Sequence, residues 1–392
     1  MANNNRFAVR KNAAKKDRYV DYNLLVAILA LLVFGLVMVY SSSSYDAYLT
    51  FGDASYYLNK QIKATLGGIA FMIGLAVVPY HFWERVRWLA YAACYVTILL
   101  IIPLGYEANG ARRWIRIFGV SMQPAEVCKI GVIIFLAAII TRMGRELLTW
   151  KGFFTVLLLV APISAFLWVL TSNASSAIIV MAIAVLMLFV STPDYRRYVL
   201  GFIVTAIVAG LAVLVIVLNA RGADSAAVGG YRGARVLAWL DPEAYASGKG
   251  FQTLQALYAI GSGGYFGKGI GESMQKLGFI PEAQNDMIFS VICEELGLFG
   301  ALALMLLFIV LLWRLKLLAD CSKDLFGALI VVGVMSHIAI QVILNIAVVT
   351  NLIPNTGISL PFISYGGSAT FFLLGELGLC FGVARGIHMR DL

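Results

Sequence analysis

Charged residues are scarce in this sequence. Only 13% of its 392 residues are Asp, Glu, Lys or Arg, whereas 61% are hydrophobic. Average soluble domains contain about 25% charged and about 45–50% apolar residues. A water-soluble enzyme of this length would lack the charges that cover its surface, and a disordered chain would be more polar. The composition therefore indicates a membrane protein.

Metal-binding and disulfide patterns are also missing. The three histidines, His81, His337 and His388, lie far apart and form no metal-ligand motif. The cysteines show no paired spacing, so we expect free thiols. They are Cys94, Cys128, Cys293, Cys321 and Cys380. The net charge of +9 is interpreted as a topology signal rather than a sign of nucleic-acid binding, and we expect no nucleic-acid partner.

Long apolar runs are what the sequence has instead. A spanning helix needs about 20 mainly apolar residues. Ten stretches qualify: 23–41, 64–80, 86–104, 125–142, 152–171, 176–192, 198–218, 286–313, 326–349 and 369–386. We therefore expect an all-α polytopic membrane protein with one membrane domain, 23–386. A basic tail (1–22) precedes it and a short tail (387–392) follows.

The basic residues predict how the chain is oriented. Most of the 30 Lys and Arg residues fall in the two tails and the short loops on one side, which marks that side as cytoplasmic and places both termini there. Three longer segments then lie outside: 105–124, 219–285 and 350–368. Long structured connections are usually functional. We expect a multi-pass membrane protein, active at its outer face.

Two of these outer segments are rich in turn-forming residues. The glycine-rich run 261–271 is not a nucleotide-binding loop, because Ser262 and Gly269 occupy positions that require Gly and Ser or Thr. It is interpreted as tight turns or close backbone approach. Segment 350–368 has no charge and contains several Gly, Pro and Ser residues. It is expected to re-enter the protein or lie at the interface.

Two ionisable residues lie at the start of the predicted span 125–142. Glu126 and Lys129 are three residues apart, so they share a helix face and can form an ion pair. One interpretation is a structural ion pair between helices, and the other is a catalytic or transport cavity. A buried pair needs further polar partners, which favours a polar cavity around it.

Three acidic residues lie near the start of the predicted span 286–313. A helix would project Asp286 and Glu294 from one face, with Glu294 about 12 Å deeper in the membrane. Asp286 either caps this helix or takes part in chemistry at its outer mouth. Glu294 and Glu295 are buried acids, for which interhelical hydrogen bonds are favoured over chemistry.

Positive charge also collects in the outer segments. Arg112, Arg113 and Arg116 either contact lipid headgroups or bind phosphate, for which arginine offers a planar fork of donors. The long segment 219–285 adds further cations: Arg232, Arg235, Lys249, Lys268 and Lys276.

Together these motifs resemble the SEDS family (FtsW, RodA and SpoVE). The motifs that carry the resemblance follow in family order from about residue 20 to 386. They are Asn109–Ile115, Gln123–Glu126, Tyr231–Arg235, Ile260–Gly264, Pro281–Asp286, Glu294–Gly297 and Leu360–Ser368. The resemblance implies a ten-helix glycosyltransferase that polymerises lipid II into peptidoglycan strands outside the cytoplasmic membrane. It also implies a class B penicillin-binding protein as transpeptidase partner, with other divisome proteins.

The resemblance assigns roles to single residues. The family's essential aspartate falls on Asp286, and the conserved acid and base of its fourth span fall on Glu126 and Lys129. One departure is Asn173, which stands in 172–177 where the family carries an acid, so no role is transferred there.

The implied reaction is an inverting glycosyl transfer with undecaprenyl pyrophosphate as leaving group. Such a reaction needs a base near the attacking hydroxyl and positive charge near the pyrophosphate. Asp286 is the candidate base. The candidates for the pyrophosphate are Arg112, Arg113, Arg116, Lys129, Arg232 and Lys276. No dedicated metal site is visible, although Mg²⁺ or Mn²⁺ bridging Asp286 and phosphate is compatible with the chemistry.

Two other functions stay open at this point. Interior charges also suit a transporter that flips lipid II, but no inverted repeat is visible and the outer segments favour one-sided chemistry. A non-catalytic scaffold for division proteins would leave the charged groups at one face unexplained. Within the family, the stretch Ile358–Tyr365 favours the division branch, with RodA-type elongation as the alternative.

Overall fold

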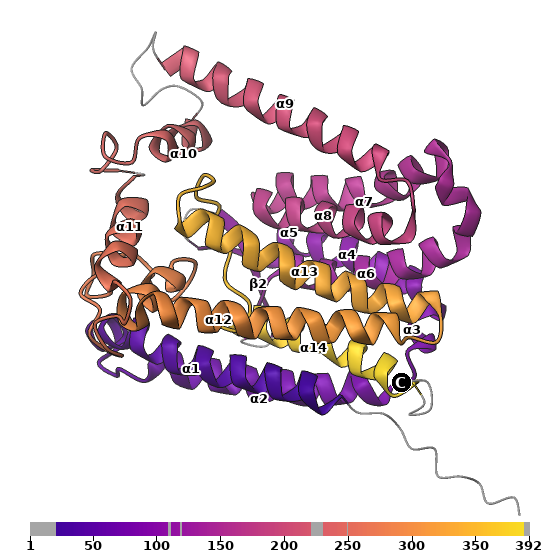
Figure 1. The fold of residues 1–392 in the computed structure, drawn as a ribbon, viewed down its shortest axis with the longest axis horizontal. Helices are drawn as coiled ribbons and strands as arrows, with labels where there is room; N and C mark the ends of the chain where they lie inside the picture. Colours follow the sequence, from indigo (N-terminus) through magenta and orange to yellow (C-terminus); the bar gives the residue numbers. More distant parts are fainter. Residues whose placement is uncertain (1–20, 109–110, 118–119, 221–229, 249, 388–392) are drawn as a thin grey trace, which may run out of the picture.

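The computed structural model describes residues 21–108, 111–117, 120–220, 230–248 and 250–387 (Figure 1). Within these ranges, ten helical stretches are long and apolar enough to cross a membrane, so the expected helical class and the ten spans are confirmed. The predicted tails 1–22 and 387–392 fall almost entirely outside the described residues. The stretches are α1 (Tyr22–Phe51), α2 (Tyr56–Val77), α4 with α5 (Arg87–Leu99 and Ile101–Leu104), α6 with η1 (Pro124–Met143 and Gly144–Leu148), α7 (Trp150–Thr171), α8 (Ala174–Ser191), α9 (Arg196–Ala220), α12 (Ile288–Asp320), α13 (Leu325–Val349) and α14 (Gly367–Ala384).

Three shorter helices complete the helical part: α3 (His81–Arg85), α10 (Gly230–Leu240) and α11 (Phe251–Gly263). Helices α10 and α11 belong to the predicted outer segment 219–285. Together with the segment that follows α13, they lie at one end of the bundle, away from the C-terminus (Figure 1). This end of the bundle therefore gathers two of the three segments that the sequence marks as functional.

The third such segment folds as a small antiparallel sheet, which the all-α expectation did not include. Its strands are β1 (Gly105–Ala108), β2 (Ala111–Ile117) and β3 (Val120–Met122), in the order β1-β2-β3. Strand β2 alternates in the way that a half-buried strand requires, because Ile115 is fully buried while Arg112 and Arg116 are exposed. The sheet thus presents arginines on one face and packs an isoleucine on the other.

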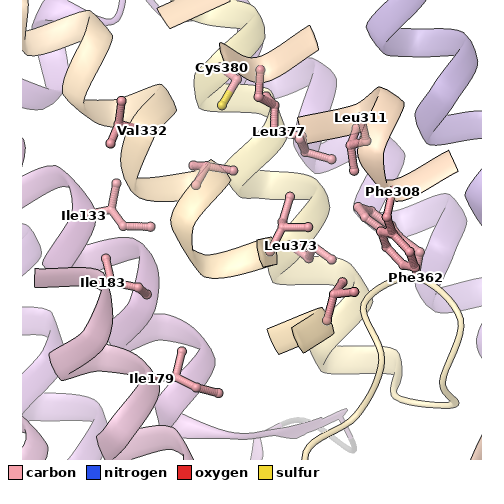
Figure 2. Packing of buried hydrophobic residues seen from close by; sticks show 14 of the residues in the cluster. Ile133, Ile179, Ile183, Phe308, Leu311, Val332, Phe362, Leu373, Leu377 and Cys380 are labelled. Carbon is pink, nitrogen blue, oxygen red and sulfur yellow. The ribbon is translucent and has the colours of Figure 1, made fainter. Parts of the chain in front are cut away.

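Helix α6 lies at the centre of the bundle. Its neighbours across the core are α8 and α13, and Figure 2 shows Ile133, Ile183 and Val332 from these three helices facing a common core. A Cβ placed on Gly333 would lie 2.7 Å from Ile133 and 3.1 Å from the sulfur of Met187. Membrane helices pack by close contact of this kind, because lipid supplies no hydrophobic drive between them.

Helix α12 is interrupted at Gly297, whose φ of 66° and ψ of −165° are not helical. The interruption frees the carbonyls of Glu294 and Glu295, which accept hydrogen bonds from the backbone N–H groups of Lys268 and Gly269, each at 2.9 Å. A broken helix at membrane depth is tolerated when neighbouring groups satisfy the freed backbone. The glycine-rich run therefore supplies these groups by close backbone approach to α12.

The segment between α13 and α14 turns back into the protein. Ile358, Leu360, Phe362 and Ile363 are buried, although no helix or strand contains them. The carbonyl of Phe362 lies so close to Gly35 of α1 that a Cβ there would clash. We call residues 351–366 the re-entrant segment.

Helix α9 stands apart from the other spans and slants away from them (Figure 1). In the part of α9 whose side chains are described, no residue is buried. The first turn of α9 contacts neighbouring helices. Arg197 stacks over Trp150 at 4.8 Å, and Tyr198 packs edge-on against Phe153 and Phe189.

Candidate active site

Asp286 lies in the turn between α11 and α12, two residues before α12 begins. The expectation that Asp286 starts the helix and shares a face with Glu294 is not met, because Glu282 has a positive φ of 51° and residues 281–287 form turns. Met287 is the N-cap residue and makes no side-chain cap. The carboxylate of Asp286 is therefore free of a capping role.

The surroundings of this carboxylate tune its acidity. Burial raises the pKa of Asp286 to about 6, the charge of Glu282 acts in the same direction, and Arg235 and Gln252 oppose them. The Nε2 atom of Gln252 in α11 lies 3.5 Å from Oδ1 of Asp286. A carboxylate with a pKa near 6 is ionised at neutral pH yet remains a better base than an ordinary aspartate.

A chain of hydrogen bonds extends from this carboxylate to α10. Gln252 accepts a hydrogen bond from Nδ2 of Asn355 at 3.1 Å, and Arg235 donates to the carbonyl of Asn355 at 3.0 Å. Asn355 belongs to the re-entrant segment. Helix α10, helix α11 and this segment therefore meet around Asp286.

The three arginines of the hairpin lie on β2, each with a different partner. Arg112 donates to a carbonyl of β1 at 2.8 Å, and the guanidinium of Arg116 lies over the ring of Tyr106 at 5.0 Å. Arg113 reaches a different element, donating to the carbonyl of Ser172 between α7 and α8 at 3.1 Å. Arg113 thus links the sheet to the α7–α8 turn.

The start of α8, directly after the α7–α8 turn, is linked to the re-entrant segment. The hydroxyl of Ser175 donates to the carbonyl of Thr356 at 2.6 Å, one residue before Gly357. A Cβ placed on Gly357 would lie 3.7 Å from Oδ2 of Asp286. The hairpin, the α7–α8 turn and Asp286 therefore follow one another along a continuous set of contacts.

The other cations named from the sequence occupy different places. Lys276 is buried and donates to Glu295 at 2.7 Å, and Lys129 pairs with Glu126 at 2.8 Å inside the bundle. The side chain of Arg232 lies outside the described part of the chain. Neither Lys129 nor Lys276 is therefore among the groups that surround the Asp286 carboxylate.

The two buried acids of α12 each accept several hydrogen bonds. Glu294 accepts from Lys268 at 2.6 Å, from the hydroxyl of Ser273 and from the backbone N–H groups of residues 274 and 275. Glu295 accepts from Ser41 of α1 at 2.7 Å as well as from Lys276. These contacts tie the segment between α11 and α12 to the broken helix.

With this geometry established, comparison with known proteins identifies the family. Residues 22–388 match the FtsW/RodA/SpoVE family, described as "Cell cycle protein". The chain belongs to this family.

Members of the FtsW/RodA/SpoVE family resemble the chain over nearly its whole length. Stage V sporulation protein E of Bacillus subtilis is 37% identical over 93% of this chain and 97% of its own. A probable peptidoglycan glycosyltransferase FtsW of Trichlorobacter lovleyi is 34% identical over 96% and 97%. Among solved structures, a chain from work on "structural coordination of polymerization and crosslinking by a peptidoglycan synthase complex" gives a TM-score of 0.76 at 27% identity, covering 94% and 98%.

The α7–α8 turn contains Asn173, to which the resemblance transferred no role. Asn173 caps α8 by accepting a hydrogen bond from the backbone of Ser176 at 3.0 Å. Asparagine is among the preferred N-cap residues, so it fills this role without a charge. Asn173 therefore stabilises the start of α8.

Sequence reasoning missed three uncharged residues of this site. Gln252, Asn355 and Asn345 contact Asp286 or its hydrogen-bonded neighbours. One signal was available: His337, Gln341 and Asn345 are spaced by four residues in an otherwise apolar span, and so share one helix face.

Proposed function

We propose that this protein is a peptidoglycan glycosyltransferase that polymerises lipid II at the outer face of the bacterial cytoplasmic membrane. The observation that carries the proposal is the Asp286 carboxylate, half-buried in a turn where α10, α11, α12 and the re-entrant segment meet. The family membership and the relative named as a probable peptidoglycan glycosyltransferase support the reaction class.

In the proposed reaction Asp286 is the general base. Its carboxylate removes the proton from the 4-hydroxyl of GlcNAc on one lipid II as that oxygen attacks the anomeric carbon of MurNAc on another. The bond to undecaprenyl pyrophosphate breaks, and the configuration at the anomeric carbon inverts. Elevation of the pKa of Asp286 to about 6 suits this role, because base strength matters most near the working pH.

The leaving pyrophosphate requires positive charge. The arginines of β2 supply it, since Arg112 and Arg116 are exposed and Arg113 joins the sheet to the α7–α8 turn. Arginine suits phosphate because its planar donors bind two oxygens at once. Loss of one such arginine is expected to weaken binding of the donor lipid more than it weakens binding of the acceptor.

A divalent cation held at the Asp286 turn would supply the same positive charge. Mg²⁺ is commonly held by one or two carboxylates together with substrate phosphates, and Asp286 and Glu282 are both within this turn. The described residues contain no group of three or more His, Cys, Asp and Glu side chains that could hold a metal by themselves. An ion shared with the substrate would neutralise the leaving pyrophosphate.

The proposed setting is cell division, with a class B penicillin-binding protein as the transpeptidase. Relatives named FtsW and SpoVE support the division or sporulation branch, and the structural relative comes from a complex that couples polymerisation to crosslinking. Elongation of the RodA type is the second candidate, because the family includes both branches. A deletion strain complemented by this chain would grow as filaments in the first case and as rounded cells in the second when the chain is depleted.

A lipid II transporter is the rival from another class. The buried pairs Glu126–Lys129 and His337–Glu376, the latter at 2.6 Å, are interior ionisable groups of the kind that transport paths use. The two functions make opposite predictions for liposomes that contain labelled lipid II. A transporter would move the label across the bilayer, and a polymerase would convert it to glycan strands without translocation.

The deciding experiment is lipid II polymerisation by the purified protein, alone and with candidate class B penicillin-binding proteins. We expect strands from the native chain, none from Asp286→Asn, and native activity from Asp53→Asn, an exposed acid in the α1–α2 turn that serves as control. Strands of normal length from Asp286→Asn, in a folded protein, would exclude Asp286 as the base.

A further inference from the structure

A polar stripe runs along one face of α13. His337, Gln341 and Asn345 are spaced by four residues, and all three are buried in a helix that is otherwise apolar on that face. His337 bonds to Glu376 of α14 at 2.6 Å and to Gln341 at 2.7 Å. Polar groups at this depth are costly unless they are paired, so their partners show what the stripe holds.

Asn345, at the upper end of the stripe, holds two separate backbone segments. Its Nδ2 donates to the carbonyl of Asp286 at 2.8 Å and to the carbonyl of Ile358 at 2.7 Å. Both partners are acceptors only, so the amide nitrogen has to face them, and the orientation of this side chain follows from chemistry. Its oxygen has no hydrogen-bond partner among the described residues.

The two segments that Asn345 joins are the Asp286 turn and the re-entrant segment, which line the candidate site. We call them the two walls of the site. The Asp286 turn carries the carboxylate, and Gly357, next to Ile358, lies close to Oδ2 of that carboxylate. A second bond joins the walls farther along, where the backbone N–H of Tyr365 donates to the carbonyl of Gln284 at 2.8 Å. Neither wall is a helix or strand, so neither is held by a regular hydrogen-bond ladder of its own.

We propose that Asn345 is a positioning residue, which fixes the distance between the Asp286 turn and the re-entrant segment by bonding to both backbones. The inference rests on the proposed function, in which Asp286 is the base. Asn345 itself touches no reacting atom. It acts by keeping the carboxylate at the mouth of the site, where the attacking hydroxyl has to lie.

The same helix offers a matched control. Gln341, one turn away on the same stripe, donates to the carbonyl of Ser359 at 3.0 Å and has no bond to the Asp286 turn. Both amides are buried, and both hold the re-entrant segment. Both variants, Asn345→Leu and Gln341→Leu, remove a bond to the re-entrant segment. Gln341→Leu also removes the bond to His337, and only Asn345→Leu removes the link to Asp286.

The first measurement does not depend on activity. Hydrogen exchange followed by mass spectrometry reports the protection of backbone amides in the two walls. We expect Asn345→Leu to speed exchange at least about tenfold in both 282–290 and 355–364, because the bonds that hold both walls are lost. Gln341→Leu should speed exchange in 355–364 only. Unchanged exchange in 282–290 for a folded Asn345→Leu would overturn the inference, whether or not lipid II is polymerised.

The second measurement separates positioning from binding. A catalytic group misplaced by about 1 Å loses on the order of 100-fold in rate. We therefore expect Asn345→Leu to lower kcat by at least about tenfold with KM for lipid II within about threefold of native, and Gln341→Leu to change kcat by less than about threefold. Faster exchange in both walls together with a native kcat would show that Asn345 stabilises the structure without positioning the base. Absence of polymerisation by the native chain would instead reject the proposed function and leave the exchange result standing.

A third variant guards against misfolding. Asn345→Ala removes the same two donated bonds but leaves room for water beside the carbonyls of Asp286 and Ile358. We expect partial recovery of kcat relative to Asn345→Leu and the same pattern of exchange. If both variants are monodisperse and both retain native exchange and native kcat, Asn345 has no positioning role.

Discussion

Lys276 donates a hydrogen bond to Glu295 across 2.7 Å, and both side chains are buried between α1 and the broken α12. The hydroxyl of Ser41 bonds to both of them, at 3.1 Å from Lys276 and 2.7 Å from Glu295. A cation that the sequence offers for substrate phosphate is therefore matched by an acid within the protein. The arrangement holds residues 264–280 against α12.

Removal of the Lys276 side chain should lower the free energy of unfolding more than removal of the Lys268 side chain. Lys276→Met leaves Glu295 charged and buried, which typically costs about 3–5 kcal/mol. Lys268 is one-third exposed, and its partner Glu294 keeps four other donors. Lys268→Met should therefore cost less than about 2 kcal/mol. Unfolding in mixed SDS and detergent micelles measures both, and equal losses would contradict the expectation.

The buried ion pair Glu126–Lys129 predicts that substitutions at these two positions are strongly coupled in their effect on the free energy of unfolding. Lys129→Met strands the carboxylate of Glu126 inside the bundle and should lower the free energy of unfolding by about 3–5 kcal/mol. The double variant Glu126→Gln with Lys129→Met has no buried charge left at this point and should recover most of the loss. A double-mutant cycle by SDS unfolding gives the coupling, and additive losses would rule out a direct interaction.

Gly297 should not tolerate a side chain. Its φ of 66° is unfavourable for alanine, and a Cβ there would collide with the backbone of Gly267. Gly297→Ala should cost about 1–3 kcal/mol or more. Gly261→Ala, in the open on α11, should instead be neutral or stabilise by up to about 1 kcal/mol. Thermal midpoints in detergent compare the two, and a stable Gly297→Ala would mean that α12 can straighten.

Polymerisation should depend on pH through Asp286. With its pKa raised to about 6, the active carboxylate form is half-populated near pH 6 and falls about tenfold for each unit below that. The rate at low lipid II concentration, measured between pH 5 and pH 8, should show one acidic limb with its midpoint near 6. An acidic limb below about 4.5 would mean that the carboxylate is solvated like an ordinary aspartate.

The same shift predicts a pH-dependent gain in stability from Asp286→Asn. The folded state binds the proton of Asp286 more tightly than the unfolded state does. Ionisation of Asp286 therefore lowers the stability of the folded state as the pH rises from about 4 to about 6, and the full loss is present above about pH 6. Asp286→Asn should therefore raise the thermal midpoint at pH 7.5, and the gain should shrink towards pH 4. A gain that grows on acidification would have the wrong sign.

The spans were predictable from the sequence because length and apolarity alone define them. The ends of the helices were less predictable, because α1 runs to Phe51, ten residues beyond the apolar run 23–41. The sheet at β1 to β3 was missed because its strands are short, with four, seven and three residues. The start of α12 was placed too early, since Glu282 and the turns after it carry no strong helix breaker.

For the site, the sequence supplied the charged residues but not their partners. Asp286, Glu126 with Lys129 and the hairpin arginines stand out because charge is rare in such a chain. The spacing of Asn345 by four residues from Gln341 places it on a polar helix face, but an uncharged amide carries no sign of what it bonds. The pairing of Lys276 with Glu295 depends on the fold of residues 264–280, which local pattern does not encode.

Helix α9 has a mechanical consequence for the whole protein. Its 25 residues span about 37 Å, which exceeds the roughly 30 Å of a bilayer core, so the helix has to tilt. The other spans pack against neighbouring helices, which set their tilt, whereas α9 is held at Arg197 and Tyr198 and its described side chains beyond the first turn are mostly exposed. We therefore expect the tilt of α9 to respond to bilayer thickness more freely than the tilt of the packed spans.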